Sequence, residues 1–151
     1  SQADLSRAML TDVNLDNVVL CHTNMPDGKR NYSNCIGANL YNANLARINL
    51  YNINLSKVNL GRADLSHANI ARSNLRGANL TASNLSHANF KNANLSRTDL
   101  TGSNLNMTNL SGSNLIGADM RKAIYLSNAN LHGAVLCHTW MPDGKENNSG
   151  C

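Results

Sequence analysis

The chain has 151 residues, enough for one domain with a buried core, and its 13 Lys and Arg against 9 Asp and Glu give a net charge of +4. Phe and Trp occur once each, and no stretch reaches the about 20 apolar residues of a membrane-spanning helix. The first residues also lack the basic and then apolar pattern of a signal peptide. The composition therefore excludes a large aromatic core, and we expect no membrane insertion.

Residues 1–20 introduce a five-residue period, with Leu5, Leu10, Leu15 and Leu20 evenly spaced. On an α-helix five residues advance the direction by about 500°, so these leucines would scatter around the cylinder. On a straight strand an odd period sends successive leucines to opposite faces. A chain that turns a corner every fifth residue places all of them inside, and four such sides close a square coil of about 20 residues. We expect residues 1–20 to form the first coil.

Residues 21–35 interrupt this array with the sequence CHTNMPDGKRNYSNC. The centre of this cassette is typical of a type I turn, because Pro fixes φ at the second position and Asp and Gly suit the next two. The turn residues are Met25, Pro26, Asp27 and Gly28. We expect the cassette to form a hairpin insert between coils, which brings Cys21 near Cys35.

Residues 36–136 form the main array, in which an aliphatic anchor recurs every five residues from Leu40 onward. Asn or Asp precedes nearly every anchor, since short polar side chains can bind backbone groups at corners. A small or β-branched residue stands two positions before each anchor. Where this residue is large, the one 20 positions later is small, as in Ile48 and Ala68. The register slips by one residue near Ala123–Leu126, where we expect a distorted corner or bulge.

This pattern resembles the pentapeptide-repeat family, as in ANLYNANLARINLYNINLSKVNLGRADLSHANI at residues 38–70. The resemblance covers nearly everything outside the two cassettes. It implies an all-β fold, the right-handed quadrilateral parallel β-helix, and the handedness comes from the resemblance alone. The repeats predict about six coils, stacked at the parallel-strand spacing of about 4.8 Å.

Residues 137–151 repeat the cassette as CHTWMPDGKENNSGC, identical at 11 of 15 positions. The second turn consists of Met141, Pro142, Asp143 and Gly144. We expect this copy to form a C-terminal hairpin cap, because an open stack of coils ends in unpaired strand edges. Four cysteines allow three pairings, and the duplication favours Cys21 with Cys35 and Cys137 with Cys151. Each disulfide would contribute about 3 kcal/mol through loop closure.

Metal binding is the alternative for these cassettes, since each contains Cys, His and a later Cys. A strand would direct Cys21 and His22 to opposite faces, and the spacing lacks the form usual for structural zinc, so disulfides are favoured. Cassettes of this kind resemble inserts in cyanobacterial and plastid-lumen members of the family. With disulfides, they indicate an oxidising compartment such as a thylakoid lumen, periplasm or the exterior.

No arrangement of nucleophile, base and acid and no phosphate-binding loop stands out, so we expect no enzyme activity, no catalytic residue, no metal and no cofactor. The main hypothesis is a structural or protein-interaction module with rigid flat faces and an unknown protein partner. The outward residues that could contact a partner are Arg47, Lys57, Arg62, His67, Arg72, Arg76 and His87. Some members of the family act as DNA mimics, but a basic rod disfavours that role. Binding to nucleic acid or to a topoisomerase is a second hypothesis, and end-to-end association of copies is a further expectation.

Overall fold

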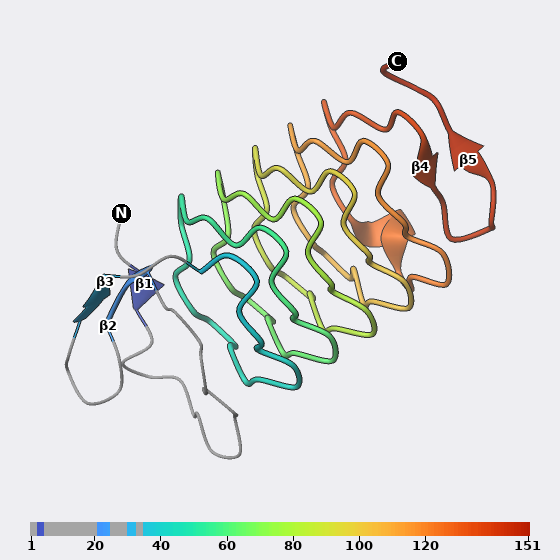
Figure 1. The fold of residues 1–151 in the computed structure, drawn as a ribbon. Helices are drawn as coiled ribbons and strands as arrows, with labels where there is room; N and C mark the ends of the chain where they lie inside the picture. The colour runs from blue at the N-terminus through green and yellow to red at the C-terminus, as the bar shows by residue number, and fades with distance from the viewer. Residues whose placement is uncertain (1–2, 5–20, 25–29, 33–34) are drawn as a thin grey trace.

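The computed structural model describes residues 3–4, 21–24, 30–32 and 35–151, with side chains from Cys35 onward. The predicted first coil, residues 1–20, therefore lies outside the described residues apart from β1. Elements of regular secondary structure are short: β1 (Ala3–Asp4), β2 (Cys21–Asn24), β3 (Arg30–Tyr32), the 3₁₀ helix η1 (Leu126–Asn128), β4 (Thr139–Trp140) and β5 (Glu146–Asn147). Between β3 and η1 the chain winds as a stack of coils (Figure 1).

Parallel β-bridges join each coil to the next, between residues that are 20 apart, as in Asn39 and Asn59. The amide of Leu40 donates to the carbonyl of Asn59 at 2.7 Å, and the amide of Asn59 donates to the carbonyl of Ala38 at 2.8 Å. Because the chain turns every five residues, each side contributes a single bridged residue. For this reason the coils contain almost no regular strand, although their backbone is paired from coil to coil.

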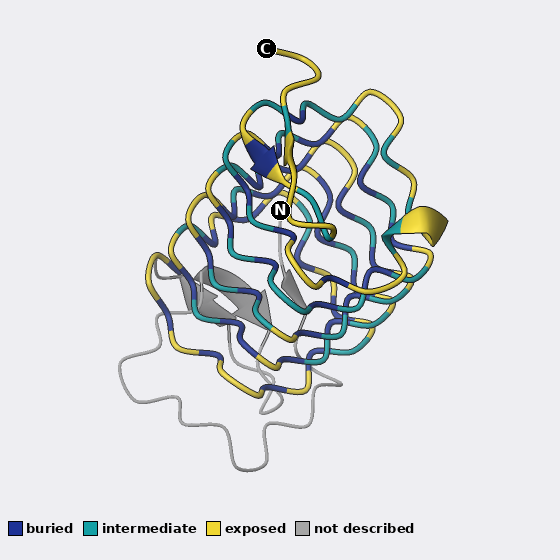
Figure 2. Ribbon diagram, turned by 90° about the vertical axis from the view of Figure 1, so that its right-hand side faces the viewer, coloured by how far each residue is buried: buried dark blue, intermediate teal, exposed yellow. Residues whose placement is uncertain are grey.

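The anchors of the five-residue period fill the interior of the coils. Every anchor from Leu40 to Met120 is buried, and so is the residue two positions before each (Figure 2). The small residues in the second set leave room for larger neighbours in the adjacent coil: Ser73 lies next to Ile53, whose amide donates to Ser73 Oγ at 3.1 Å. Ser103 is different, because its Oγ is buried and has no hydrogen-bond partner.

Each corner is a four-residue turn whose third residue has a positive φ. At the corner after Leu40 the amide of Ala43 donates to the carbonyl of Leu40 at 3.2 Å, and Asn42 has a φ of 59°. A turn in which the third residue has a positive φ and the second does not is a type II turn. Gly or Asn is favoured at the third position. Many corners instead carry long side chains at this position: Arg47, Lys57, Arg62, His67, Arg72, His87, Arg97, Met107 and Lys122. Each of these residues costs about 1 kcal/mol relative to Gly.

The Asn before each anchor forms ladders of side-chain hydrogen bonds along the faces. Asn89 Oδ1 accepts the amide of Lys91 at 3.1 Å and the side-chain amide of Asn109 at 3.3 Å, and Asn89 Nδ2 donates to Asn69 Oδ1 at 3.3 Å. The predicted role of Asn at the corners is therefore confirmed. Asp64 occupies the same position and accepts, but a carboxylate has no N–H with which to continue the ladder.

One extra residue enters the array at the predicted slip. Bridges join residues 20 apart up to Ile124 and 21 apart from Asn130 onward. Between them Tyr125 has a φ of 60° and η1 follows, projecting from the side of the stack (Figure 2). The distortion predicted at Ala123–Leu126 is confirmed.

Each cassette begins as part of a coil and continues as a hairpin. β2 pairs in parallel with β1, 20 residues earlier, and antiparallel with β3. β4 pairs antiparallel with β5, and its Trp140 also bridges Asp119 of the preceding coil. Thr139 is fully buried and occupies the small-residue position, two residues before an anchor. The coil therefore runs through Trp140, beyond the point at which the cassette begins in the sequence.

The turn of the C-terminal hairpin is closed by a hydrogen bond from the amide of Gly144 to the carbonyl of Met141 at 3.0 Å. The corresponding turn of the first cassette, Met25–Gly28, lies outside the described residues. The C-terminal segment then folds back on the last coil, where the amide of Leu136 donates to the carbonyl of Ser149 at 3.1 Å. This contact places the segment over the edge of the stack.

Candidate functional site

The outward side chains fall into two unlike halves when they are sorted by corner. We number the corners by the anchor that first precedes each: corner 1 follows Leu40, corner 2 Leu45, corner 3 Leu50 and corner 4 Leu55, and each recurs every 20 residues. The basic half consists of corners 2, 3 and 4 with the two faces between them. The remaining half consists of corner 1 and the faces on either side of it.

The basic half holds six Lys and Arg between residues 36 and 136: Arg47 at corner 2, Arg72 and Lys91 at corner 3, and Lys57, Arg76 and Arg97 at corner 4. It holds no Asp or Glu within that range. The other half holds three cations and three acids: Arg62, Arg121, Lys122, Asp64, Asp99 and Asp119. The net positive charge of the array therefore lies on the basic half, because the three cations of the other half are balanced by three carboxylates.

At corner 4 three cations line a shallow groove. Lys57, Arg76 and Arg97 border it together with Asn74 and Ser56. They come from successive coils, whose backbones are stacked about 4.8 Å apart. Within the described part of the chain none of the three forms an ion pair. Their charges are therefore available to a ligand.

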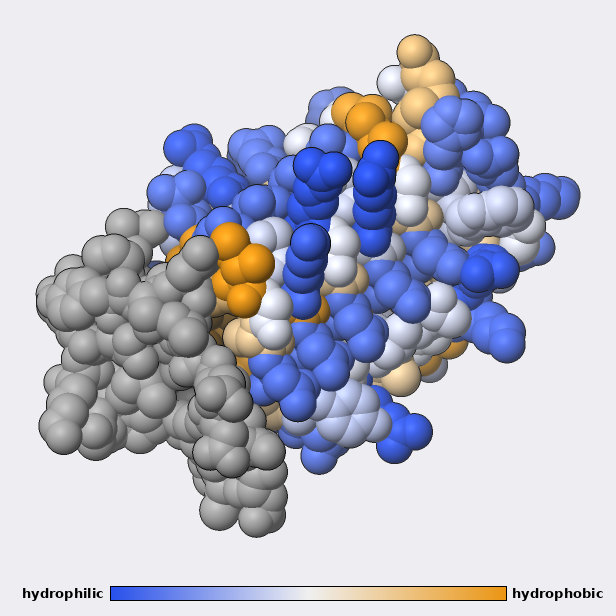
Figure 3. All heavy atoms as spheres, viewed as in Figure 1, coloured by the Kyte–Doolittle hydropathy of each residue, from blue (hydrophilic) through white to orange (hydrophobic). Residues whose placement is uncertain are grey.

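The other two basic corners combine cations with flat rings. At corner 3 the Arg72 guanidinium carbon lies 6.0 Å from the centre of the Tyr51 ring, beside a second groove that Lys91 also borders. At corner 2 the rings of His67 and His87 are stacked, with centres 4.7 Å apart and an angle of 1° between the planes. Hydrophilic side chains cover most of the face shown in Figure 3, with small and separate apolar patches.

The residues proposed from the sequence as partner contacts do not share one surface. Arg62 lies at corner 1, on the half that also holds the acids, whereas the other six lie on the basic half. Lys91 and Arg97 belong to the basic half and were not among the predicted contacts. Sorting the cations by their position within 20 residues would have found both.

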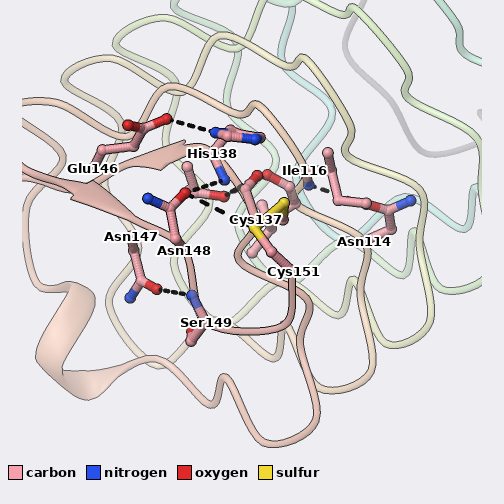
Figure 4. Close-up of a disulfide and its surroundings, with 11 residues drawn as sticks. Asn114, Ile116, Cys137, His138, Glu146, Asn147, Asn148, Ser149 and Cys151 are labelled. Carbon is pink, nitrogen blue, oxygen red and sulfur yellow. Dashed lines mark hydrogen bonds and ion pairs between the residues drawn. A yellow bond between two sulfur atoms is a disulfide. The ribbon is translucent and has the colours of Figure 1, made fainter.

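The C-terminal cassette is closed by a disulfide between Cys137 and Cys151, whose Cα atoms are 4.9 Å apart (Figure 4). This is the pairing that the sequence predicts within this cassette. Cys35 is buried and disulfide-bonded. The side chain of Cys21 lies outside the described residues, so the pair Cys21 with Cys35 stays a prediction.

His138 is held beside the disulfide by two contacts (Figure 4). Its ring Nδ1 lies 2.8 Å from Glu146 Oε1, and its amide donates to Asn148 Oδ1 at 3.1 Å. Asn148 Oδ1 also lies 3.9 Å from Cys151 Sγ. His138, which precedes β4, Glu146 of β5 and Asn148 of the chain end thus lie around the disulfide.

The second cassette differs from the first at this point, because Cys21 and His22 belong to β2 whereas Cys137 and His138 precede β4. Cys137 and His138 are the two corner residues after Leu136, and His138 has a φ of 52°. One ligand atom from each of Cys137, His138 and Cys151 lies within 4.8 Å of the others. In the described part of the chain this is the only cluster of three such residues, and the stacked His67 and His87 have no third ligand.

A charged pair lies next to the cap, on the last coils. Arg121 Nη2 donates to Asp119 Oδ2 at 2.6 Å, and this hydrogen bond holds the pKa of the Asp119 carboxyl below its usual value against the opposing effect of burial. Asp119 in turn raises the pKa of Arg121. The Arg121 guanidinium carbon also lies 5.7 Å from the centre of the Trp140 ring.

Eight copies of the family model for pentapeptide repeats match the chain, over residues 1–27, 33–70, 59–97 and 93–139. The chain belongs to the pentapeptide-repeat family. This membership implies a right-handed quadrilateral β-helix, in agreement with the bridges between residues 20 apart. Proteins of this family are generally structural or interaction modules rather than enzymes.

Three crystal structures of pentapeptide-repeat proteins illustrate the likeness. A protein from the Arabidopsis thaliana thylakoid lumen is 25% identical, with a TM-score of 0.58 over 60% of this chain and 63% of its own. A protein from the cyanobacterium Cyanothece 51142 is 29% identical, with a TM-score of 0.58 over 67% of this chain and 85% of its own. A protein from Nostoc PCC 7120 is 32% identical, with a TM-score of 0.55 over 64% of this chain and 82% of its own.

This pentapeptide-repeat protein matches less than two thirds of the length of the Arabidopsis relative. A comparison with curated proteins gave no match. Among the described residues no helix has the length and apolar character needed to cross a membrane.

Proposed function

We propose that this pentapeptide-repeat protein is a non-enzymatic interaction module that presents its basic half to an acidic protein partner. The observation that carries the proposal is the one-sided charge: six cations and no acid on the basic half, against three cations and three acids on the other half. The cations themselves are spread evenly, since three of the four corners carry six of the nine. The asymmetry comes from the acids, all three of which lie on the faces beside corner 1. Complementary charge would guide the approach of the partner and fix its orientation.

Rigidity supports this role. The faces are held by backbone hydrogen bonds between coils, by Asn ladders and by a continuous core. A preformed surface loses little conformational entropy on binding, so a few charge pairs can give a useful affinity. The corners of the basic half also project their cations away from the backbone, where a partner can reach them.

The two cassettes serve the same module in this proposal. Residues 21–35 form a hairpin insert closed by Cys21 and Cys35, residues 36–136 form the main array, and residues 137–151 form the cap, with about six coils in all. The disulfide at Cys137 and the relative from a thylakoid lumen support an oxidising compartment such as a thylakoid lumen, periplasm or the exterior. End-to-end association of copies is part of the same proposal.

Nucleic acid is the alternative ligand of the basic half, because phosphates would also be attracted to it. Six charges spread over three corners are few for a nucleic-acid site, and Tyr51 is the only Phe, Tyr or Trp at corners 2, 3 and 4 between residues 36 and 136. DNA mimicry is disfavoured, because it requires an acidic surface. We therefore favour an acidic protein segment.

The test compares two triple variants of equal net charge. Lys57→Gln, Arg76→Gln and Arg97→Gln together remove corner 4, and Arg62→Gln, Arg121→Gln and Lys122→Gln together remove corner 1. Each set contains two left-handed corner residues, but the corner 1 set also removes the ion pair of Arg121 with Asp119, so thermal unfolding must first show that both variants stay folded. The probe is immobilised polyglutamate, eluted with a salt gradient, and immobilised duplex DNA is run in parallel.

We expect the corner 4 variant to elute from polyglutamate at clearly lower salt than the wild type, and the corner 1 variant to elute close to it. Equal shifts for the two variants would show that net charge alone determines retention and would refute the proposal. Stronger and equally corner-specific retention on DNA would instead favour the nucleic-acid alternative.

A further inference from the structure

We propose that reduction of the Cys137–Cys151 disulfide converts the C-terminal cassette into a zinc site. The ligands are the thiolates of Cys137 and Cys151 and the imidazole of His138, whose ligand atoms already lie within 4.8 Å of one another. Two sulfurs and one nitrogen form a donor set that zinc prefers. This inference is independent of the basic half and of any partner.

The three ligand atoms can adopt the separations that tetrahedral zinc requires. Bond lengths of about 2.3 Å to sulfur and about 2.1 Å to nitrogen place tetrahedral ligand atoms about 3.5–3.8 Å apart. Once the disulfide is broken, the sulfurs must separate by about 1.7 Å from their bonded distance, which rotation about their side-chain bonds can supply. The backbone is suited to this, because the Cα atoms are 4.9 Å apart.

Glu146 sets the tautomer and the orientation of the His138 ring for metal binding. With a proton on Nδ1, the imidazole donates to Glu146 Oε1 at 2.8 Å, which leaves Nε2 as the nitrogen that can bind zinc. A carboxylate in this position fixes the tautomer and orients the ring, as in many zinc proteins. Asn148 adds a second restraint through the amide of His138. A water molecule would complete four ligands, since the site lies at the surface with His138 and Cys151 exposed.

The chemistry balances with a dithiol as reductant. The dithiol transfers two electrons and two protons to the Cys137–Cys151 bond and becomes a disulfide itself, which leaves two thiols in the cassette. Zinc then displaces the two thiol protons and binds the thiolates. Disulfide and zinc close the same loop of the chain, so the cap stays attached to the last coil in both redox states.

The experiment measures zinc taken up by the whole chain after anaerobic reduction with a phosphine, against a chromogenic competing chelator. The variant with Cys137→Ser and Cys151→Ser is the first blank, because it retains whatever the N-terminal cassette binds. Oxidised wild type is a second blank that does not depend on the folding of a variant. We expect reduced wild type to bind one more zinc per chain than the double serine variant and at least one more than oxidised wild type. Cobalt in its place should give the thiolate charge-transfer band of a tetrahedral site.

Two substitutions assign the nitrogen ligand and its support. We expect His138→Asn to weaken the site at least tenfold, whereas the control His87→Asn, at another left-handed corner, leaves it unchanged. Removal of the supporting carboxylate by Glu146→Gln should weaken zinc binding about tenfold. Equal zinc uptake by reduced wild type and the double serine variant would overturn the proposal. So would a reduced site whose affinity is the same with His138→Asn.

Discussion

The Asn ladder makes a quantitative prediction at Asn89, which lies in the middle of the stack. Asn89 takes part in three hydrogen bonds: it accepts from the Lys91 amide and from Asn109, and it donates to Asn69. A typical hydrogen bond contributes about 0.5–1.5 kcal/mol net, and lengths of 3.1–3.3 Å place these toward the weak end. Asn89→Ala should therefore lower the free energy of unfolding by about 2 kcal/mol.

Asn89→Asp separates the two roles of the side chain. A carboxylate keeps both accepted hydrogen bonds but cannot donate to Asn69, so the expected loss is about 0.5–1 kcal/mol. For a chain of this length the melting temperature should fall by about 4–8 °C for Asn89→Ala and by about 1–3 °C for Asn89→Asp. Neighbouring positions of this ladder carry Asn, so the new charge has no like charge beside it.

Urea unfolding followed by circular dichroism measures both variants, with calorimetry for the melting temperatures. The reasoning requires the order wild type, Asn89→Asp, Asn89→Ala in decreasing stability. Equal losses for the two variants would mean that the accepted corner hydrogen bond contributes nothing. A loss below about 0.5 kcal/mol for Asn89→Ala would mean that the ladder only accompanies the fold.

Three further predictions concern strain, burial and charge. Ala82→Gly should stabilise the protein by about 1 kcal/mol because Ala82 has a φ of 53°, whereas Ala46→Gly, at a corner position without a positive φ, should destabilise it in the same urea assay. Ser103→Ala should raise the unfolding free energy by about 1 kcal/mol, since it removes a buried hydroxyl without a partner, and a loss of stability would indicate a bound water there. Arg121→Gln should raise the pKa of Asp119, as measured by carboxyl chemical shifts. Because that pKa is lowered in the folded state, the contribution of Asp119 to stability is present above its unfolded pKa and is lost as the pH falls through the lowered value.

The five-residue period was sufficient to predict the coil because its consequence is purely geometric. Anchors at Leu40, Leu45 and Leu50 can all be buried only if the chain turns between them, and the bridges between residues 20 apart follow from four turns per coil. The slip before Leu126 was equally visible as a break in this register. The positive φ of Arg47 and Lys57 was not, because such side chains rarely adopt it and only the hydrogen bonding of the coils imposes it.

The cassette was harder to interpret, because the turn motif drew attention away from the five-residue period, which continues through the first five residues of the cassette. In CHTWM, Thr139 takes the small position, Trp140 the Asn position and Met141 the anchor, so the period continues through Met141. Extending the register from Leu136 would have placed the Cys and His at a corner. The approach of Glu146 to that corner could not be predicted, since it depends on how the hairpin folds back.

The left-handed corners also bear on the proposed function, because they are where the fold holds strain. Ala82 and Met107 show that a corner tolerates such strain without any charge. Arg47, Lys57 and Arg97 accept the same strain, and in the part of the chain that the structure describes none of them gains an ion pair. Arg62 and Lys122 adopt the same conformation on the other half, so the strain belongs to the fold and not to one surface. What distinguishes Arg47, Lys57 and Arg97 is that their half carries no acid between residues 36 and 136. In the proposed function, an acidic partner supplies the missing carboxylates.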